Sequence, residues 1–211
     1  MKILILGATG MVGKVLTRAA LAEGHQVTTL VRNPHKLGNL EQNVTVIEGE
    51  YFDRETLLSA ISGVDAVLST IGPPMKRTPN SNEYTDAMQS MISAMQDNAV
   101  KRIVAIGGAG LRLGDEPIAF GRAMMRRVLI LLSGANYLDK EREHNALFSS
   151  DLDWTIVRPP QITDAEGELT VTSDKVQAFK VDTCQLARFM LDCLEDDSTV
   201  KTAPFVSTVK L

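Results

Sequence analysis

Several features that mark exported, membrane or nucleic-acid-binding proteins are scarce in this sequence of 211 residues. It contains only two cysteines, Cys184 and Cys193, which are too few for a disulfide scaffold. No apolar run approaches the roughly 18 residues of a membrane span. Acidic residues outnumber basic residues by 26 to 22, and the resulting net charge of -4 disfavours a nucleic-acid partner.

The amino terminus also lacks the features of a secretory signal. The apolar run Ile3–Leu6 stops at Gly7, and the charged residues Lys14 and Arg18 follow in a stretch with helical spacing. We therefore expect a cytoplasmic protein with no membrane partner. Its two cysteines are interpreted as reduced thiols that line the core from one helix.

What the sequence does have is the composition of a folded domain. It is 44% hydrophobic and 23% charged, which favours a globular protein and excludes disorder. Internal repeats, low-complexity tracts and interdomain linkers are not found. The length suits one ordinary domain with a substantial core, so we predict a single domain over residues 1–211.

Short runs rich in β-branched residues alternate with stretches of helical spacing. The β-like runs lie at residues 2–7, 26–32, 44–49, 65–70, 101–107 and 154–159, and the clearest helical stretches lie at 12–23, 54–61 and 85–98. Strands that are apolar on both faces and separated by amphipathic helices indicate a parallel sheet covered on each side. The predicted fold class is therefore α/β, a doubly wound Rossmann-type parallel sheet with helices on both faces.

The pattern changes after residue 107. Residues 108–136 contain "GGAGLRLGDEP" and then the apolar, methionine-bearing "IAFGRAMMRRVLILL", a segment too long for a tight connection. Segments in this position cover the substrate in such folds. Further on, a short strand at 168–173, a helix at 182–195 and a last strand in "PFVSTV" predict a small C-terminal lobe on the substrate side, within roughly 160–211.

The clearest functional motif is "GATGMVG", which places Gly7, Gly10 and Gly13 between the first strand and the first helix. A dinucleotide pyrophosphate needs backbone N–H donors and space that side chains would deny. Gly7 permits the sharp turn, Gly10 lets the backbone approach phosphate, and Gly13 lets the helix pack closely on the strand. Thr9 can add a hydroxyl donor. The motif therefore predicts dinucleotide binding.

The end of the second strand indicates which dinucleotide is bound. Sites for NAD usually carry an acidic residue there for the ribose hydroxyls. This sequence has "LVRNPHKL" instead, with Arg32 and Lys36 and no carboxylate. Arginine is planar and permanently charged, which suits a 2′-phosphate. We therefore predict NADP(H) and a single NAD(P)-binding Rossmann domain over residues 1–211. A solvated loop arginine is the alternative interpretation of Arg32.

With these motifs, the sequence resembles the atypical short-chain dehydrogenases/reductases of the NmrA-like NAD(P)H-binding family, and within it the flavin and biliverdin reductases. The resemblance covers nearly the whole chain and rests on "GATGMVG", "LVRNPHKL", "RIVAIGGAG", "DLDWTIVRPPQI" and "VDTCQLARFMLDCL" in the family's order. It implies an NAD(P)H-dependent oxidoreductase that reduces a flavin or a similar conjugated acceptor.

The resemblance also implies a set of cofactor contacts at the carboxyl ends of the strands. Those on the adenosine and pyrophosphate side are Thr9, Gly10, Met11, Val12, Arg32, Lys36, Glu50 and Tyr51. Those along the ribose and nicotinamide are Thr70, Ile71, Gly72, Ile106, Gly107, Pro159, Pro160 and Ile162.

The catalytic residues of the main short-chain family are incomplete here. That family has a serine after the fifth strand, where this sequence has Gly107 and Gly108. Lys140 stands where the family's lysine is expected, but the tyrosine four residues before it is replaced by Asn136. Tyr137 is only three residues before it, about 100° around the helix from the expected position. No proton-relay triad can be assembled.

These residues leave two interpretations open. Lys140 is either a ribose contact or a solvated charge, and Tyr137 is either a catalytic candidate or an amphipathic residue at a helix start. His144, one turn after Lys140, could reach the same cleft, although a lone histidine on a helix surface has a simpler explanation. His25 and His35 lack metal-ligand spacing, so we expect no metal site.

The sequence gives weaker signals for the residues that bind the acceptor. Phe120, Met124 and Met125 could wall an apolar pocket above the nicotinamide, although ordinary helix packing is the simpler interpretation. Arg158 either attracts an anionic ligand or is a charge at a strand end.

The missing serine constrains the chemistry. Reduction of an ordinary ketone makes an alkoxide, which needs a positioned acid. Reduction of a flavin or linear tetrapyrrole places charge in a delocalised system that solvent can protonate, so proximity suffices. We therefore predict an NADPH-dependent reductase of a small conjugated acceptor, acting as a monomer or small homo-oligomer. The alternative is an NADP(H)-sensing regulatory protein of the NmrA-like type, and an epimerase is disfavoured by Arg32.

Overall fold

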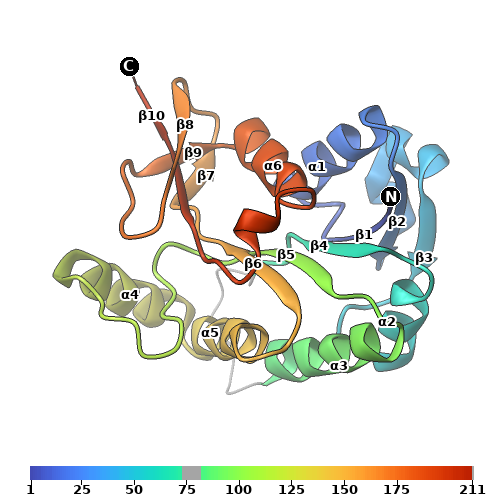
Figure 1. The fold of residues 1–211 in the computed structure, drawn as a ribbon, viewed down its shortest axis with the longest axis horizontal. Helices are drawn as coiled ribbons and strands as arrows, with labels where there is room; N and C mark the ends of the chain where they lie inside the picture. Colours follow the sequence, from blue (N-terminus) through green and yellow to red (C-terminus); the bar gives the residue numbers. More distant parts are fainter. Residues whose placement is uncertain (73–81, 211) are drawn as a thin grey trace.

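The computed structural model describes residues 1–72 and 82–210, and its centre is a six-stranded parallel sheet (Figure 1). The strands are β1 (Lys2–Leu6), β2 (Gln26–Val31), β3 (Thr45–Glu48), β4 (Ala66–Ser69), β5 (Arg102–Ile106) and β6 (Asp153–Val157). Their order is β3-β2-β1-β4-β5-β6, and every neighbouring pair is parallel. This is the strand order of the Rossmann fold, so the predicted fold class is confirmed.

Helices cover both faces of this sheet. The helices α1 (Met11–Ala22) and α6 (Thr183–Asp192) lie on one face, and α2 (Arg54–Ile61), α3 (Glu83–Asp97) and α5 (Ala135–Phe148) lie on the other (Figure 1). Strand β1 contributes Ile3 and Ile5 to the first layer and Leu4 and Leu6 to the second, all fully buried. This two-sided burial explains why the strand sequences are apolar throughout.

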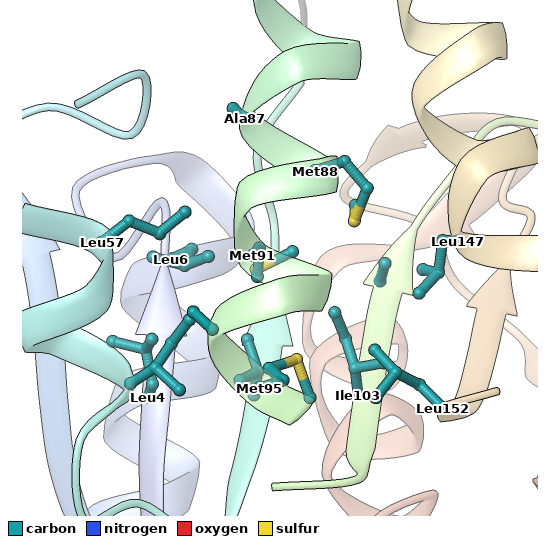
Figure 2. Packing of buried hydrophobic residues seen from close by; sticks show 14 of the residues in the cluster. Leu4, Leu6, Leu57, Ala87, Met88, Met91, Met95, Ile103, Leu147 and Leu152 are labelled. Atoms are coloured by element: carbon teal, nitrogen blue, oxygen red, sulfur yellow. The ribbon is translucent and has the colours of Figure 1, made fainter. Parts of the chain in front are cut away.

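The core beneath α3 shows how helical spacing becomes packing. Met88, Met91 and Met95 recur every three or four residues on α3. Met91 lies beside Leu6 of β1, and Met88 lies toward Leu147 of α5 (Figure 2). All three methionines are fully buried. Shortening a buried side chain of this size to alanine costs about 2–5 kcal/mol, so this layer supports the strands whose ends carry the site.

Several elements were not predicted. Residues Pro34–Asn43 form a 3-10 segment, η1, and a further short one, η2, covers Asp197–Thr199. The segment after β5 forms α4 (Phe120–Ser133), which meets α5 at Gly134. Gly134 has a φ of 57°, a left-handed conformation that glycine adopts without strain and that lets the chain change direction between the two helices.

The C-terminal residues form two small sheets. Strand β8 (Glu168–Thr172) pairs antiparallel with β10 (Phe205–Val209), and β7 (Gln161–Thr163) pairs parallel with β9 (Lys180–Asp182). They lie at the same end of the molecule as α4 and opposite to β3 (Figure 1). The predicted strands at 168–173 and in "PFVSTV" are present, whereas β7 and β9 are only three residues each and gave no recognisable pattern.

The two cysteines differ in their surroundings. Both are free thiols; Cys193 is buried directly after α6, but Cys184 is exposed in the first turn of that helix. The expectation that both line the core is therefore wrong for Cys184, because it stands on the outer side of α6. None of the helices within the described ranges combines the length and apolar character needed to cross a membrane.

Candidate functional site

A cavity of about 630 Å³ opens at the carboxyl ends of β4, β5 and β6. Its wall is completed by the start of α1, by α4 and α5, and by the turn before β9. The strand order reverses between β1 and β4, which is where doubly wound sheets bind their ligands. The cavity brings together these residues of the predicted cofactor set: Val12, Thr70, Ile71, Gly72, Ile106, Gly107, Lys140, Pro159, Pro160 and Ile162.

The glycine turn between β1 and α1 is packed too closely for side chains. Gly7 has a φ of 82°, and the N–H of Gly10 donates to its carbonyl at 2.9 Å. A Cβ atom on Gly13 would overlap the carbonyl oxygen of Gly7 and would lie 2.7 Å from its carbonyl carbon and 2.8 Å from the Cα of Ala8. Glycine at position 13 therefore lets α1 begin directly against the turn, as the motif requires.

The start of α1 is suited to a pyrophosphate. Gly10 is its N-cap and provides no capping side chain, and the first turn carries no acidic residue. The first N–H groups of a helix have no partner within the helix, and the helix dipole favours an anion there. Thr9 is half-buried and Met11 is exposed at this end. The residues present therefore fit the phosphates of a dinucleotide.

Arg32 and Lys36 stand beyond the end of β2, where the adenosine end of a dinucleotide would lie. Both side chains are exposed. Within the described part of the chain, neither forms an ion pair. Two cations without carboxylate partners fit a phosphate group at this position.

The two residues after β3 that were expected to contact the adenine, Glu50 and Tyr51, differ in their exposure. Glu50 is exposed, but Tyr51 is buried and its hydroxyl donates to Oε1 of Glu143 at 2.9 Å. The exposed ring here is that of Phe52, which makes edge contacts with Tyr51 and Tyr84 at centroid distances of 5.4 and 5.1 Å. The adenine contact of Glu50 and Tyr51 stays a prediction.

Lys140 lies at the centre of a buried polar network on α5. Its Nζ forms an ion pair with Glu143, donates to the carbonyl of Ile71 at 2.9 Å and lies 4.9 Å above the ring of Tyr84. Both Lys140 and Glu143 are buried. Lys140 is therefore not a solvated charge, and its contact with the ribose stays a prediction.

His144 is a buried cavity residue, so its interpretation as an ordinary surface histidine is wrong. Its Nδ1 lies 2.8 Å from the carbonyl of Lys140 and its Nε2 lies 3.0 Å from the carbonyl of Ile106. Burial, reinforced by the charge of Lys140, lowers the pKa of the imidazole and favours the neutral ring. His144 therefore joins α5 to the end of β5.

Tyr137 also faces the cavity rather than solvent. Its hydroxyl is buried and has no hydrogen-bond partner among the described residues. It lies beside Gly110, where an added Cβ atom would come within 2.9 Å of the hydroxyl oxygen. Burial, followed by the charge of Glu141, raises the pKa of Tyr137 above its usual value. The hydroxyl therefore stays protonated and can donate a hydrogen bond into the cavity.

The three apolar residues of α4 that were considered for the acceptor pocket lie in different surroundings. Met125 lines the cavity, whereas Phe120 and Met124 are exposed, with 82% of Phe120 accessible. Phe120 and Met124 are therefore neither packed in the core nor part of the cavity wall, so both interpretations are wrong for them. Leu129, one turn after Met125, was missed although its spacing could have identified it.

Other lining residues also escaped sequence analysis. They are Gly108, Ala109, Gly110, Leu111, Gln161 and Phe179, and they lie in loops or short strands without periodic patterns.

Arg158 has a structural role. Its Nη1 donates to both carboxylate oxygens of Glu116 at 2.9 Å, and its guanidinium lies 3.8 Å above the ring of Phe205. It is buried and does not line the cavity, so it is unavailable to an anionic ligand there. Within the described residues, no cluster of histidine, cysteine, aspartate and glutamate could hold a metal ion.

Comparison with known proteins gives matches along most of the chain. A family model described as NAD(P)H-binding matches residues 7–197. The Bacillus subtilis protein YwnB is 29% identical over 182 residues, which cover 83% of this chain and 79% of YwnB. Phenylcoumaran benzylic ether reductase IRL1 of Ginkgo biloba is 40% identical over 80 residues, which cover 34% of this chain and only 26% of that enzyme.

Solved structures with the same fold include two of particular interest. ChuY, an anaerobillin reductase from Escherichia coli O157:H7, superposes with a TM-score of 0.81 at 19% identity and covers 100% of this chain and 98% of its own. A short-chain dehydrogenase/reductase from Veillonella parvula in complex with NADP superposes with a TM-score of 0.79 at 21% identity, covering 98% and 94%. At these identities the likeness concerns the fold.

Proposed function

The chain belongs to the NAD(P)H-binding family, and on that premise we propose that it is an NADPH-dependent reductase whose acceptor is a flavin or a similar conjugated ring. It is an atypical short-chain dehydrogenase/reductase with the Rossmann fold, and an NAD(P)H-dependent oxidoreductase. The proposal concerns the preference for NADPH, the acceptor and the residues that bind them.

The observation that supports this acceptor is the character of the cavity. Among the described residues that line it, Lys140 is the only one with a formal charge, and Glu143 neutralises it. Gly107, Gly108 and Gly110 follow β5 and leave one wall without side chains. A flat, apolar ring can lie closely against such a surface, whereas a charged or bulky substrate would gain little.

The residues present suit a reaction that needs positioning more than acid catalysis. Bound NADPH supplies a hydride, and a flavin that accepts it takes up one proton to give the reduced flavin. Solvent can deliver that proton because the charge is delocalised over the ring. Tyr137 can donate a hydrogen bond to the acceptor, and His144 and Lys140 hold α5 in place beside it.

The preference for NADPH rests on Arg32 and Lys36. A hydrogen bond to a charged group contributes about 1.5–3 kcal/mol, so an arginine on the 2′-phosphate should favour NADPH over NADH at least about tenfold. Both cations are exposed and without ion-pair partners in the described ranges.

The experiment that tests the cofactor proposal is the substitution Arg32→Ala, with Arg18→Ala as the control. Arg18 is exposed on α1 and lies outside the cavity. We expect the dissociation constant of NADPH, measured by calorimetry, to rise at least about tenfold in Arg32→Ala while that of NADH barely changes. Equal losses for both dinucleotides would show that Arg32 does not contact the 2′-phosphate.

Turnover is tested by following NADPH oxidation with FMN. The proposal expects oxidation, with kcat reduced about threefold to tenfold by Tyr137→Phe, which removes one hydrogen bond worth about 0.5–1.5 kcal/mol. Absence of oxidation with flavins, quinones and biliverdin would favour the NADP(H)-sensing alternative.

A further inference from the structure

Phe179 is an exposed aromatic residue at the mouth of the cavity. Its side chain is 91% accessible, the highest value among the exposed large apolar side chains of the described residues. It lines the cavity and also lines a second, open hollow of about 740 Å³ beside β9. Phe179 therefore stands on the border between the two spaces.

The backbone of Phe179 is held although its ring is not packed. Its carbonyl accepts a hydrogen bond from the N–H of Gln161 at 3.2 Å, and the next residue, Lys180, pairs with Gln161 in the sheet of β7 and β9. The backbone thus holds the Cα of Phe179 at the rim, and the ring is free to turn toward a ligand. Unlike the similarly exposed Phe120, Phe179 lines a cavity, so its ring would gain burial by contact with a ligand that enters there.

We propose that Phe179 stacks on the flat ring of the acceptor and that the second hollow receives the acceptor's tail, an inference that rests on the proposed function of the same cavity. The ring would lie between the glycine-lined wall after β5 and Phe179. Because Phe179 lines both spaces, a substituent on the ring would pass beside Phe179 to reach the second hollow.

The charges of the second hollow indicate which tail it accepts. Its lining has three carboxylates, Asp164, Glu166 and Asp182, and two lysines, Lys180 and Lys210. The carboxylate of Asp182 already accepts from the N–H groups at the start of α6. Without an excess of positive charge, an anionic tail gains no net attraction, whereas hydroxyl groups can hydrogen-bond to either kind of side chain. The acceptor class is therefore a planar conjugated ring with an uncharged, hydroxyl-bearing tail.

The stacking is tested by binding, independently of turnover. The protein is saturated with NADP⁺ and titrated with lumiflavin, a flavin ring without a tail, while flavin fluorescence is followed. We expect the dissociation constant to rise about tenfold in Phe179→Ala and to change less than about twofold in Phe179→Trp, which keeps an aromatic face. Phe120→Ala is the matched control, because Phe120 is similarly exposed but lies outside both hollows, and it should bind like the parent protein.

Turnover separates this inference from the proposed function. A stacking contact is made before and during hydride transfer, so Phe179→Ala should raise KM for riboflavin with little change in kcat. If NADPH oxidation by flavins proceeds and Phe179→Ala matches Phe120→Ala in binding and KM, the inference is wrong while the proposed function stands. If lumiflavin binds with the expected dependence on Phe179 but no NADPH is oxidised, the acceptor site stands and the proposed function is wrong.

The tail is tested with three flavins in the same titration. Riboflavin should bind more tightly than lumiflavin, because its hydroxyl-bearing chain reaches the second hollow. FMN should bind no more tightly than riboflavin, because its phosphate meets three carboxylates as well as two lysines. Equal affinity for lumiflavin and riboflavin would overturn the assignment of the second hollow to the tail.

Discussion

The two walls of the cavity differ in how they are built. The inner wall consists of the strand ends, the glycine turn and α5, and its polar residues Lys140, Glu143 and His144 are at most 5% exposed. The outer wall consists of α4 and the turn that carries Phe179, which is 91% exposed. On the face of α4 that does not line the cavity, Leu131 is 68% exposed. The buried charges of the inner wall therefore already have partners, although the hydroxyl of Tyr137 has none among the described residues, whereas Phe179 of the outer wall leaves apolar surface exposed.

Because of this difference, the two walls suit different roles in ligand binding. A preformed inner wall can hold the cofactor in one geometry, because each buried charge there already has its partner. The outer wall has side chains that can adjust to the shape of an acceptor, as methionine does readily. We therefore expect similar substitutions to have a large effect on stability in the inner wall and a small effect in the outer wall.

The largest effect is expected for Lys140→Met. This change leaves Glu143 as a buried carboxylate without its cation, and the loss of one partner from a buried pair costs about 3–5 kcal/mol. The free energy of unfolding, measured by urea denaturation, should fall by that amount. The second change Glu143→Gln, made in the same chain, should recover a large part of the loss because it removes the uncompensated charge.

An exposed ion pair provides the contrast. Arg188 pairs with Glu23 and Asp192, but its side chain is 59% exposed. Exposed pairs contribute about 0–1 kcal/mol, so Arg188→Ala should change the stability by less than about 1 kcal/mol. If Lys140→Met were no more harmful than Arg188→Ala, the inner wall would not be the fixed part of the site.

The next largest effect is expected for Gly13→Ala, compared with Gly121→Ala on α4. A methyl group on Gly13 would overlap backbone atoms of Gly7 and Ala8, which cannot move without displacing β1 or α1. We expect a loss of about 3 kcal/mol in unfolding free energy. A Cβ on Gly121 meets nothing within 4 Å, so Gly121→Ala should stabilise α4 by about 0.5 kcal/mol. Equal changes in unfolding free energy for Gly13→Ala and Gly121→Ala would mean that the glycine turn is packed no more tightly than α4.

The inner wall was the more predictable of the two from sequence. Strands such as Lys2–Leu6 are short, apolar and bounded by turns, and their positions fix which residues meet at the sheet edge. The glycine turn has the same basis, since only glycine fits where α1 begins against Gly7. The sequence could not show that Tyr51 donates to Glu143, because 92 residues separate them along the chain.

The outer wall was predicted poorly for a physical reason. Helical spacing identifies which side chains of α4 share a face, but not which face meets the sheet. Of the residues considered there, Met125 lines the cavity while Phe120 is exposed. Phe179 was missed because a single aromatic residue in an irregular segment has no periodicity to reveal its place. An exposed phenylalanine such as Phe179 departs from the rule that apolar side chains are buried, and sequence analysis relies on that rule.

The junction between the walls should be sensitive to acid. Glu116 accepts hydrogen bonds from Arg122 of α4 and from Arg158 after β6. Burial, the largest influence, raises the pKa of Glu116, but the two arginines together outweigh it, so the pKa lies below its usual value of 4.5. A lowered carboxyl pKa stabilises the fold above about pH 4.5 and loses that contribution as the pH falls toward the folded-state pKa.

The substitution Glu116→Gln measures this contribution. At pH 7 it should cost about 1 kcal/mol or less in unfolding free energy, because the side chain is partly exposed and solvent screens its charge. The difference between Glu116→Gln and the parent protein should shrink as the pH is lowered below about 4.5. Denaturation series at several pH values provide the measurement, and a difference that grows on acidification would contradict the assigned sign.

The smallest effect is expected for Leu131→Gln on the outer face of α4. A leucine that is 68% exposed contributes little burial, so the stability should change by no more than about 0.5 kcal/mol. By contrast, Leu4→Ala beneath the inner wall should cost about 2–5 kcal/mol, because Leu4 is fully buried. A large loss in Leu131→Gln would mean that this face of α4 is covered in solution.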